Sequence, residues 1–108
     1  FENARGTNPE ELIAAANAAC YSMAFAHYLS QKGHAPESIV TRATVSLDDG
    51  VIARMHLQTR GSVPGLGEAE FRQLAEEAEK QCKVSNVLRS GLTITLDAAL
   101  SPSTARGS

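Results

Sequence analysis

The 108-residue chain is long enough for one domain with a modest hydrophobic core, and its formal net charge is −2 at pH 7. Acidic and basic residues are scattered along it rather than clustered. This pattern argues against a nucleic-acid partner and against an anionic-membrane partner. The chain begins with Phe1 rather than Met, so we expect it to be an N-terminally truncated form of a longer domain.

Residues 8–31 predict one long central helix. Asn8 is a good N-cap, Pro9 suits the first helical position, and Glu10 and Glu11 fall in the first turn. The next charged residue is Lys32, so the helix should be buried on most sides. We expect one helical stripe to face packing rather than water: Leu12, Ala16, Cys20, Met23 and His27.

A soluble core helix is a better interpretation of this stretch than a membrane span or a signal peptide. A span needs about 20 strongly apolar residues, whereas here alanine dominates and Asn17, Ser22 and His27 interrupt the run. A signal peptide would follow a basic region, and this stretch follows two glutamates. We therefore expect no membrane partner and a cytoplasmic location.

Alternating apolar and polar residues predict strands at 39–47 and 51–59, joined by a turn at residues 48–50. An amphipathic helix should follow from residue 68, then a short helix at 85–88 and a strand at 92–98. Residues 101–108 are expected to form a disordered polar tail. The apolar face of the amphipathic helix contains Phe71, Leu74, Ala75, Ala78 and Cys82.

This element order indicates a single α+β domain over residues 1–100. A three-stranded sheet cannot cover a long helix that is apolar nearly all round. Missing N-terminal strands, a second copy of the chain, or both should cover the remainder. We therefore expect an obligate homodimer.

Cys20 and Cys82 are the two cysteines, and both are expected on buried helix faces. They could be small core residues, since free cysteine is often buried. A structural disulfide is disfavoured in a cytosolic chain, and a zinc site lacks the closely spaced Cys and His ligands that it needs. The remaining possibility is a redox pair, in which one thiolate attacks and the other resolves.

A redox role makes a physical demand on Cys20. Burial among alanines should raise the pKa of its thiol, and a position in the middle of a helix is far from the positive end of the helix dipole. A cation must then be supplied, and an arginine held by a carboxylate would suit. Arg42, Arg54 and Arg60 are expected on the solvated strand faces, and nothing directs Arg5 inward.

Four segments together resemble the osmotically inducible protein C / organic hydroperoxide resistance (OsmC/Ohr) family, in the correct order from residue 6 to residue 100. They are GTNPEELIAAANAACYSMA (6–24), VPGL (63–66), CKVSNVL (82–88) and ITLDAAL (94–100). The first segment is the most specific. The VSNVL that follows Cys82 is more similar to the osmotically inducible branch.

The resemblance implies a thiol peroxidase that reduces organic hydroperoxides and, less readily, hydrogen peroxide. Cys20 matches the peroxidatic cysteine, which becomes a sulfenic acid, and Cys82 matches the resolving cysteine, which closes a disulfide with it. Glu10 matches the glutamate that orients the catalytic arginine. The resemblance implies no cofactor, only an external dithiol reductant such as a lipoyl group. The implied fold is an intertwined homodimer with an antiparallel sheet packed on a long central helix and two sites at the interface.

The spacing and the family pattern raise two further expectations. Glu10 and Cys20 should lie about 15 Å apart along one helix, so a shared site would be assembled in trans from two chains. The family arginine would fall just ahead of Phe1, with Arg5 at best a substitute. Lys83 stands where the family usually has proline, and Asn17 where histidine is common. The rival function is a non-catalytic dimeric member of the fold or a small-ligand binder that uses the interface cleft.

Overall fold

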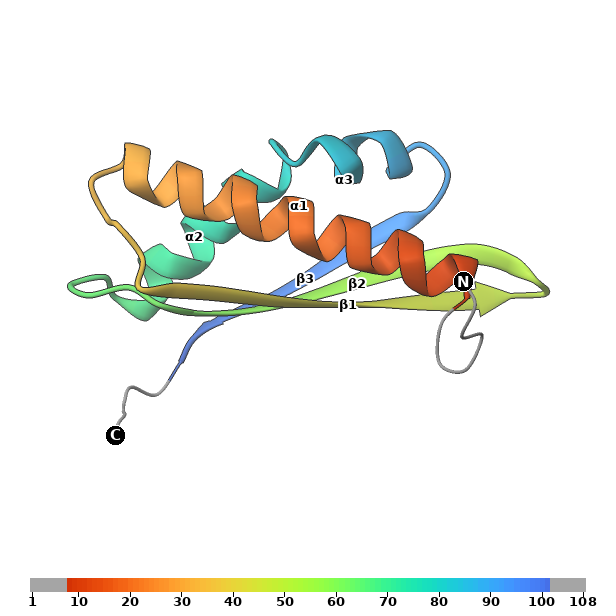
Figure 1. The fold of residues 1–108 in the computed structure, drawn as a ribbon, viewed down its shortest axis with the longest axis horizontal. Helices are drawn as coiled ribbons and strands as arrows, with labels where there is room; N and C mark the ends of the chain where they lie inside the picture. Colours follow the sequence, from red (N-terminus) through yellow and green to blue (C-terminus); the bar gives the residue numbers. More distant parts are fainter. Residues whose placement is uncertain (1–7, 102–108) are drawn as a thin grey trace.

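A computed structural model describes residues 8–101 of the chain, so Arg5 and all but the first residue of the predicted tail at 101–108 lie outside this described part. Three strands form one sheet in the order β1-β2-β3, and the helices gather over one of its faces (Figure 1). The predicted α+β class is confirmed. The elements are α1 (Pro9–Gln31), β1 (Ser38–Asp48), β2 (Val51–Ser62), α2 (Glu68–Glu79), α3 (Lys83–Leu88) and β3 (Thr93–Leu100).

Helix α1 begins where the sequence predicts. The Asn8 side chain accepts a hydrogen bond from the Glu11 backbone N–H at 2.9 Å, and Pro9 is the first helical residue. At the other end, the positive φ of Gly33 (87°) follows the last turn. These local signals fix both ends of the helix.

The buried stripe of α1 differs from the predicted one. Leu12 is 40% exposed and Met23 is 72% exposed, so the predicted stripe is largely uncovered within the chain. The sheet and α2 instead bury the neighbouring stripe, because that stripe carries the aromatic rings, which bury the most apolar surface. Its buried members are Ala14, Asn17, Tyr21, Phe25 and Leu29.

Helix α1 is long and apolar enough to cross a membrane, judged by length and composition alone. Its mean hydropathy over the best window is 1.2. However, Tyr21, Phe25 and Leu29 are fully buried in the core of this chain, and the Phe25 ring lies 5.2 Å from the Phe71 ring of α2. These contacts are those of a core helix.

Strands β1 and β2 form the predicted antiparallel hairpin. Asp49 and Gly50 form its two-residue turn, and both have a positive φ (55° and 77°). Alternation places Met55, Leu57 and Thr59 in the core. The register shifts after Ser46, and the strand ends beyond this irregularity are exposed, which the regular alternation did not predict.

Strand β3 corrects the expectation of an antiparallel sheet, because it pairs with β2 in the parallel direction. The chain leaves the end of β2 and crosses back through α2 and α3 before β3 begins opposite Arg54. Such a helical crossover is the connection that parallel neighbours require. The sheet is therefore mixed.

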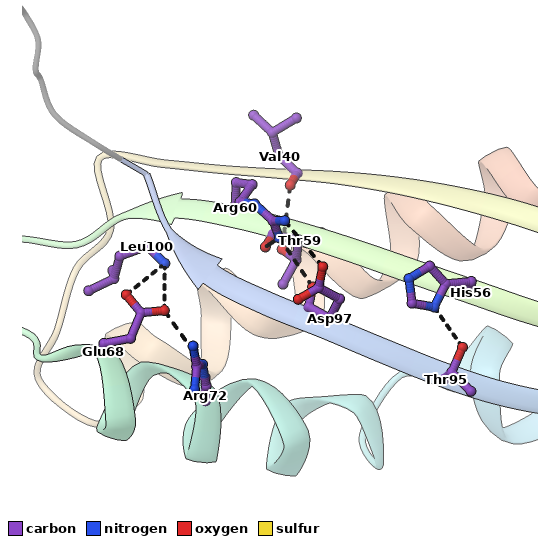
Figure 2. A network of polar contacts seen from close by, with 9 residues as sticks. All are labelled: Val40, His56, Thr59, Arg60, Glu68, Arg72, Thr95, Asp97 and Leu100. Atoms are coloured by element: carbon purple, nitrogen blue, oxygen red, sulfur yellow. Dashed lines mark hydrogen bonds and ion pairs between the residues drawn. The ribbon is translucent and has the colours of Figure 1, made fainter.

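The sheet face that points away from the helices carries polar side chains. Arg60 pairs with Asp97 across β2 and β3, with the guanidinium nitrogen 3.2 Å from the carboxylate oxygen (Figure 2). His56 Nδ1 lies 2.6 Å from Thr95 Oγ1 on the same pair of strands (Figure 2). Arg60 thus lies on the solvated face predicted for it and is directed away from the helices.

Candidate functional site

Cys20 lies on α1 at the wall of an open cavity of about 460 Å³. Its side chain is partly exposed rather than enclosed, in contrast to the packing predicted from the stripe. α1 also contributes the apolar side chains of Met23 and Ala24, and the segment after α2 contributes Gln81 and Lys83. The cavity therefore combines an apolar wall with polar and cationic groups beside a thiol.

Cys82 does not belong to α2, although its spacing continues the apolar face of that helix. α2 ends at Glu79, and Cys82 is the N-cap of α3, with an extended backbone (φ −73°, ψ 117°). Its sulfur accepts the Ser85 backbone N–H at 3.5 Å. Cys82 is fully buried, as the pattern predicted, but the capping position was not foreseen because the short helix α3 starts earlier than expected.

The structure brings Cys20 and Cys82 together as free thiols, close enough for each to shift the pKa of the other. Burial alone would raise the pKa of the Cys20 thiol. It is outweighed by hydrogen bonds from the Val84 backbone, the Cys82 side chain and the Lys83 backbone, together with the positive charge of Lys83. The net pKa of Cys20 lies below the ordinary value for a thiol, so its thiolate is favoured.

This result overturns the expectation of a raised pKa at Cys20. The sequence argument considered only α1, in which Cys20 sits far from the helix N-terminus. The chain returns at Lys83 and Val84 and presents the backbone N–H groups that open α3 to the Cys20 sulfur. Among the described residues, Lys83 supplies a nearby positive charge in the same place.

The pKa of Cys82 moves in the opposite direction. Burial raises it most, and donors from Ser85 lower it only in part. Contact with Cys20 raises it further, because the Cys82 thiol donates its proton toward the Cys20 sulfur. The two sulfurs are thus unlike: Cys20 is the accessible, more acidic thiol, and Cys82 is the buried one.

Asn17 is a neighbour of this pair that sequence reasoning did not select. It is fully buried on α1, and its side-chain amide nitrogen lies 2.9 Å from Ser85 Oγ and 3.7 Å from the Cys82 sulfur. A polar residue within an alanine-rich helix, one turn before Cys20, was the available sequence signal. Its partners could not be predicted because they lie on α3.

Glu10 is not close to this cavity within one chain. It lines a separate open cavity of about 520 Å³ near the start of α1, together with Asn8, Glu11 and residues of β1. The structure therefore unites two of the three predicted site residues, Cys20 and Cys82, and leaves the third apart.

Within residues 8–101, the structure contains no cluster of three or more His, Cys, Asp or Glu side chains that could hold a metal ion. The chemistry available at the site is that of the two sulfurs and of the N–H groups and charge around them.

An α+β domain whose helices cover one sheet face and which holds two neighbouring cysteines, one partly exposed and one buried, defines a class of candidate thiol redox proteins. Residues 2–97 match the family model described as OsmC-like protein, so the chain belongs to the OsmC-like family. It is 43% identical over 98 residues to the peroxiredoxin OsmC of Escherichia coli (strain K12), covering 87% of this chain and 68% of that protein.

Two further relatives agree. The organic hydroperoxide resistance protein of Xanthomonas axonopodis pv. citri (strain 306) is 31% identical over 100 residues, covering 87% of this chain and 68% of that protein. A crystal structure of an organic hydroperoxide resistance protein OsmC from Legionella pneumophila superposes with a TM-score of 0.71 at 26% identity, covering 90% and 72% of the two chains. The predicted family is confirmed, and the names of these relatives support a redox function related to hydroperoxides.

Proposed function

We propose that this chain is a thiol-dependent peroxidase that reduces organic hydroperoxides, and hydrogen peroxide more weakly, through Cys20 and Cys82. The observation that carries the proposal is the proximity of a more acidic Cys20, at an open cavity, to a buried Cys82. A thiolate is the nucleophilic form of cysteine, and a reactive cysteine needs both ionisation and access. Cys20 has both.

The first step is attack of the Cys20 thiolate on the hydroperoxide. An S–O bond forms, the O–O bond breaks, and the alcohol leaves after taking up a proton, so that Cys20 becomes a sulfenic acid. Met23 and Ala24 line one wall of the cavity and would contact the organic group. A surface of this kind favours an organic hydroperoxide over hydrogen peroxide, which has no apolar part to bury.

The second step joins the two sulfurs. Cys82 attacks the Cys20 sulfenic acid, an S–S bond forms, the S–O bond breaks, and water leaves. An external dithiol, such as a lipoyl group, then reduces the disulfide and is itself oxidised to a disulfide. No metal or prosthetic group enters this cycle. Repeated reduction requires a reducing compartment, which is why a cytoplasmic location is part of the proposal.

The proposal includes a homodimer with sites completed in trans. Glu10 lines one cavity and Cys20 another, so within one chain the carboxylate and the thiol do not share a site. Met23, which lines the thiol cavity, is 72% exposed, and Val87 of α3 is 75% exposed, so apolar surface remains uncovered. A second copy would cover this surface and bring its own Glu10 toward Cys20.

The dimer can be tested with Met23→Glu, which places a carboxylate on this apolar surface. Sedimentation should show a dimer for the unmodified chain and a monomer for the variant. Glu76→Gln is a matched control because it changes charge at an exposed position of α2. A monomeric unmodified chain, or a variant that remains dimeric, would contradict the proposed interface.

The enzymatic function is tested by counting free thiols before and after addition of cumene hydroperoxide. The proposed peroxidase loses both thiols of each chain and regains them when dihydrolipoamide is added. A chain that only binds a ligand retains its thiols at low peroxide concentration. Retention of both thiols would therefore reject the peroxidase in favour of the rival non-catalytic function.

A further inference from the structure

A buried polar cluster surrounds the Cys82 sulfur. Asn17, Ser85 and Cys82 are each 0% exposed. The Asn17 amide nitrogen donates to Ser85 Oγ at 2.9 Å and to the Cys82 sulfur at 3.7 Å, and the Ser85 backbone N–H donates to the same sulfur at 3.5 Å. The sulfur of Cys82 thus receives one N–H donor from α1 and another from α3.

The oxygen of the Asn17 side-chain amide, in contrast, makes no hydrogen bond in this cluster. Asn17 Oδ1 is buried and has no hydrogen-bond partner within the described part of the chain. A buried acceptor without a partner is destabilising, and an apolar residue at this position would avoid that cost. The amide therefore uses its N–H groups while its acceptor remains unpaired, which indicates that the donors are the part that matters.

We infer that Asn17 is a positioning residue that, together with the Ser85 backbone N–H, holds Cys82 as the thiolate that closes the disulfide. This inference rests on the proposed peroxidase function. In the closing step the Cys82 thiolate forms the S–S bond, the S–O bond of the Cys20 sulfenic acid breaks, and the released hydroxide takes up a proton to become water. N–H donors bind a thiolate more strongly than a thiol because the bond becomes charge-assisted.

Burial and the neighbouring Cys20 disfavour the thiolate form of Cys82. Cys20 and Tyr21 face Cys82 from α1, and the pKa of Tyr21 is raised by burial and then by the negative charges of Glu79, Cys82 and Glu76. Glu79 is paired with Arg89 at 2.7 Å, and Lys83 lines the cavity beside Cys20. Burial and the contact with Cys20 raise the pKa of Cys82, and among the groups acting on it the Ser85 donors lower it.

The test is Asn17→Asp, which keeps the size of the side chain but replaces the N–H donors with an acceptor. Samples are quenched with acid after one equivalent of cumene hydroperoxide, and mass spectrometry separates the sulfenic acid from the disulfide. Oxidation of Cys20 should be little changed. Disulfide closure should slow at least about tenfold, the factor that one pKa unit represents, and its pH profile should move upward.

The matched control is Thr59→Val, which alters another fully buried polar side chain, on β2, whose hydrogen bonds go to Thr41 and Val40. It should lower stability without slowing closure. Closure in Asn17→Asp that is as fast as in the control would overturn the inference.

A second measurement does not depend on peroxidase activity or on the folding of Asn17→Asp. Thiolate absorbance is titrated in Cys20→Ser, with Asn17 retained and with Asn17→Ala, which adds no charge to the helix. The apparent pKa of Cys82 should be higher in the Asn17→Ala background. Equal pKa values would overturn the inference. If the unmodified chain forms neither sulfenic acid nor disulfide, the proposed function fails, and this titration still decides the role of Asn17.

Discussion

Cys20 and Cys82 lie close enough to act on each other, and their interaction lowers the pKa of Cys20 while it raises the pKa of Cys82. The pKa of Cys20 is lowered although burial acts against it, and the pKa of Cys82 is raised chiefly by burial. The fold thus gives two chemically identical cysteine side chains different pKa values. Such a division suits an attacking thiol and a resolving thiol.

The pH dependence of Cys20 follows from this interaction. The thiolate reacts and the thiol does not, so a lowered pKa gives Cys20 a larger thiolate fraction at a given pH than an unperturbed thiol would have. The rate of alkylation by iodoacetamide should fall only as the pH falls through this lowered pKa.

In Cys82→Ala the midpoint should move upward, because the Cys82 donor is lost. Cys20→Ser serves as the control, since it reports the slow background from buried Cys82. A midpoint for Cys20 at or above that of free cysteine would contradict the assigned electrostatics.

Lys83 contributes a positive charge to the Cys20 site, in addition to its backbone N–H. Lys83→Gln should slow alkylation of Cys20 by iodoacetamide at neutral pH about two- to fivefold, the range expected for a solvent-exposed charge. The effect should shrink as salt is added. Lys80→Gln is the matched control, because Lys80 is also exposed but does not act on Cys20. Equal alkylation rates in Lys83→Gln and Lys80→Gln would show that the charge of Lys83 does not act on Cys20.

Gly61 on β2 is held by close packing rather than by an unusual backbone. A Cβ at this position would lie 2.7 Å from Ile39 Cδ1 and 3.0 Å from the Phe71 ring. Gly61→Ala should therefore lower the free energy of unfolding by about 1–3 kcal/mol, as overpacked core sites do. Chemical denaturation measures this change.

Gly91→Ala provides the comparison, because the added Cβ would meet the Leu88 carbonyl oxygen at an ordinary 3.8 Å. Its free energy of unfolding should change by less than about 0.5 kcal/mol. Equal effects of the two substitutions would show that the packing around Gly61 can relax.

Local signals were sufficient to predict much of the fold. The cap at Asn8, the turn at Asp49-Gly50 and the apolar face around Phe71 are each determined by residues close in sequence, and the structure confirms all three. The resemblance to the family also extended over nearly the whole chain, and the family match agrees with it.

Features that depend on distant contacts were predicted incorrectly. The periodicity of α1 allowed several apolar stripes, and only the sheet and α2 select the one with Tyr21 and Phe25. The parallel direction of β3 follows from the crossover through α2 and α3 rather than from its own alternation. The pKa of Cys20 depends on backbone N–H groups of Lys83 and Val84, which no pattern within α1 contains.

The most direct test of the central claim is the mass of each cysteine variant after exposure to cumene hydroperoxide. Cys20→Ser should gain no oxygen, because the attacking thiolate is absent. Cys82→Ser should gain one oxygen or more, since its Cys20 sulfenic acid cannot be resolved, and the unmodified chain should lose two hydrogens as the disulfide forms. Oxidation of Cys20→Ser at the rate of the unmodified chain, or no oxygen gained by Cys82→Ser, would contradict the account.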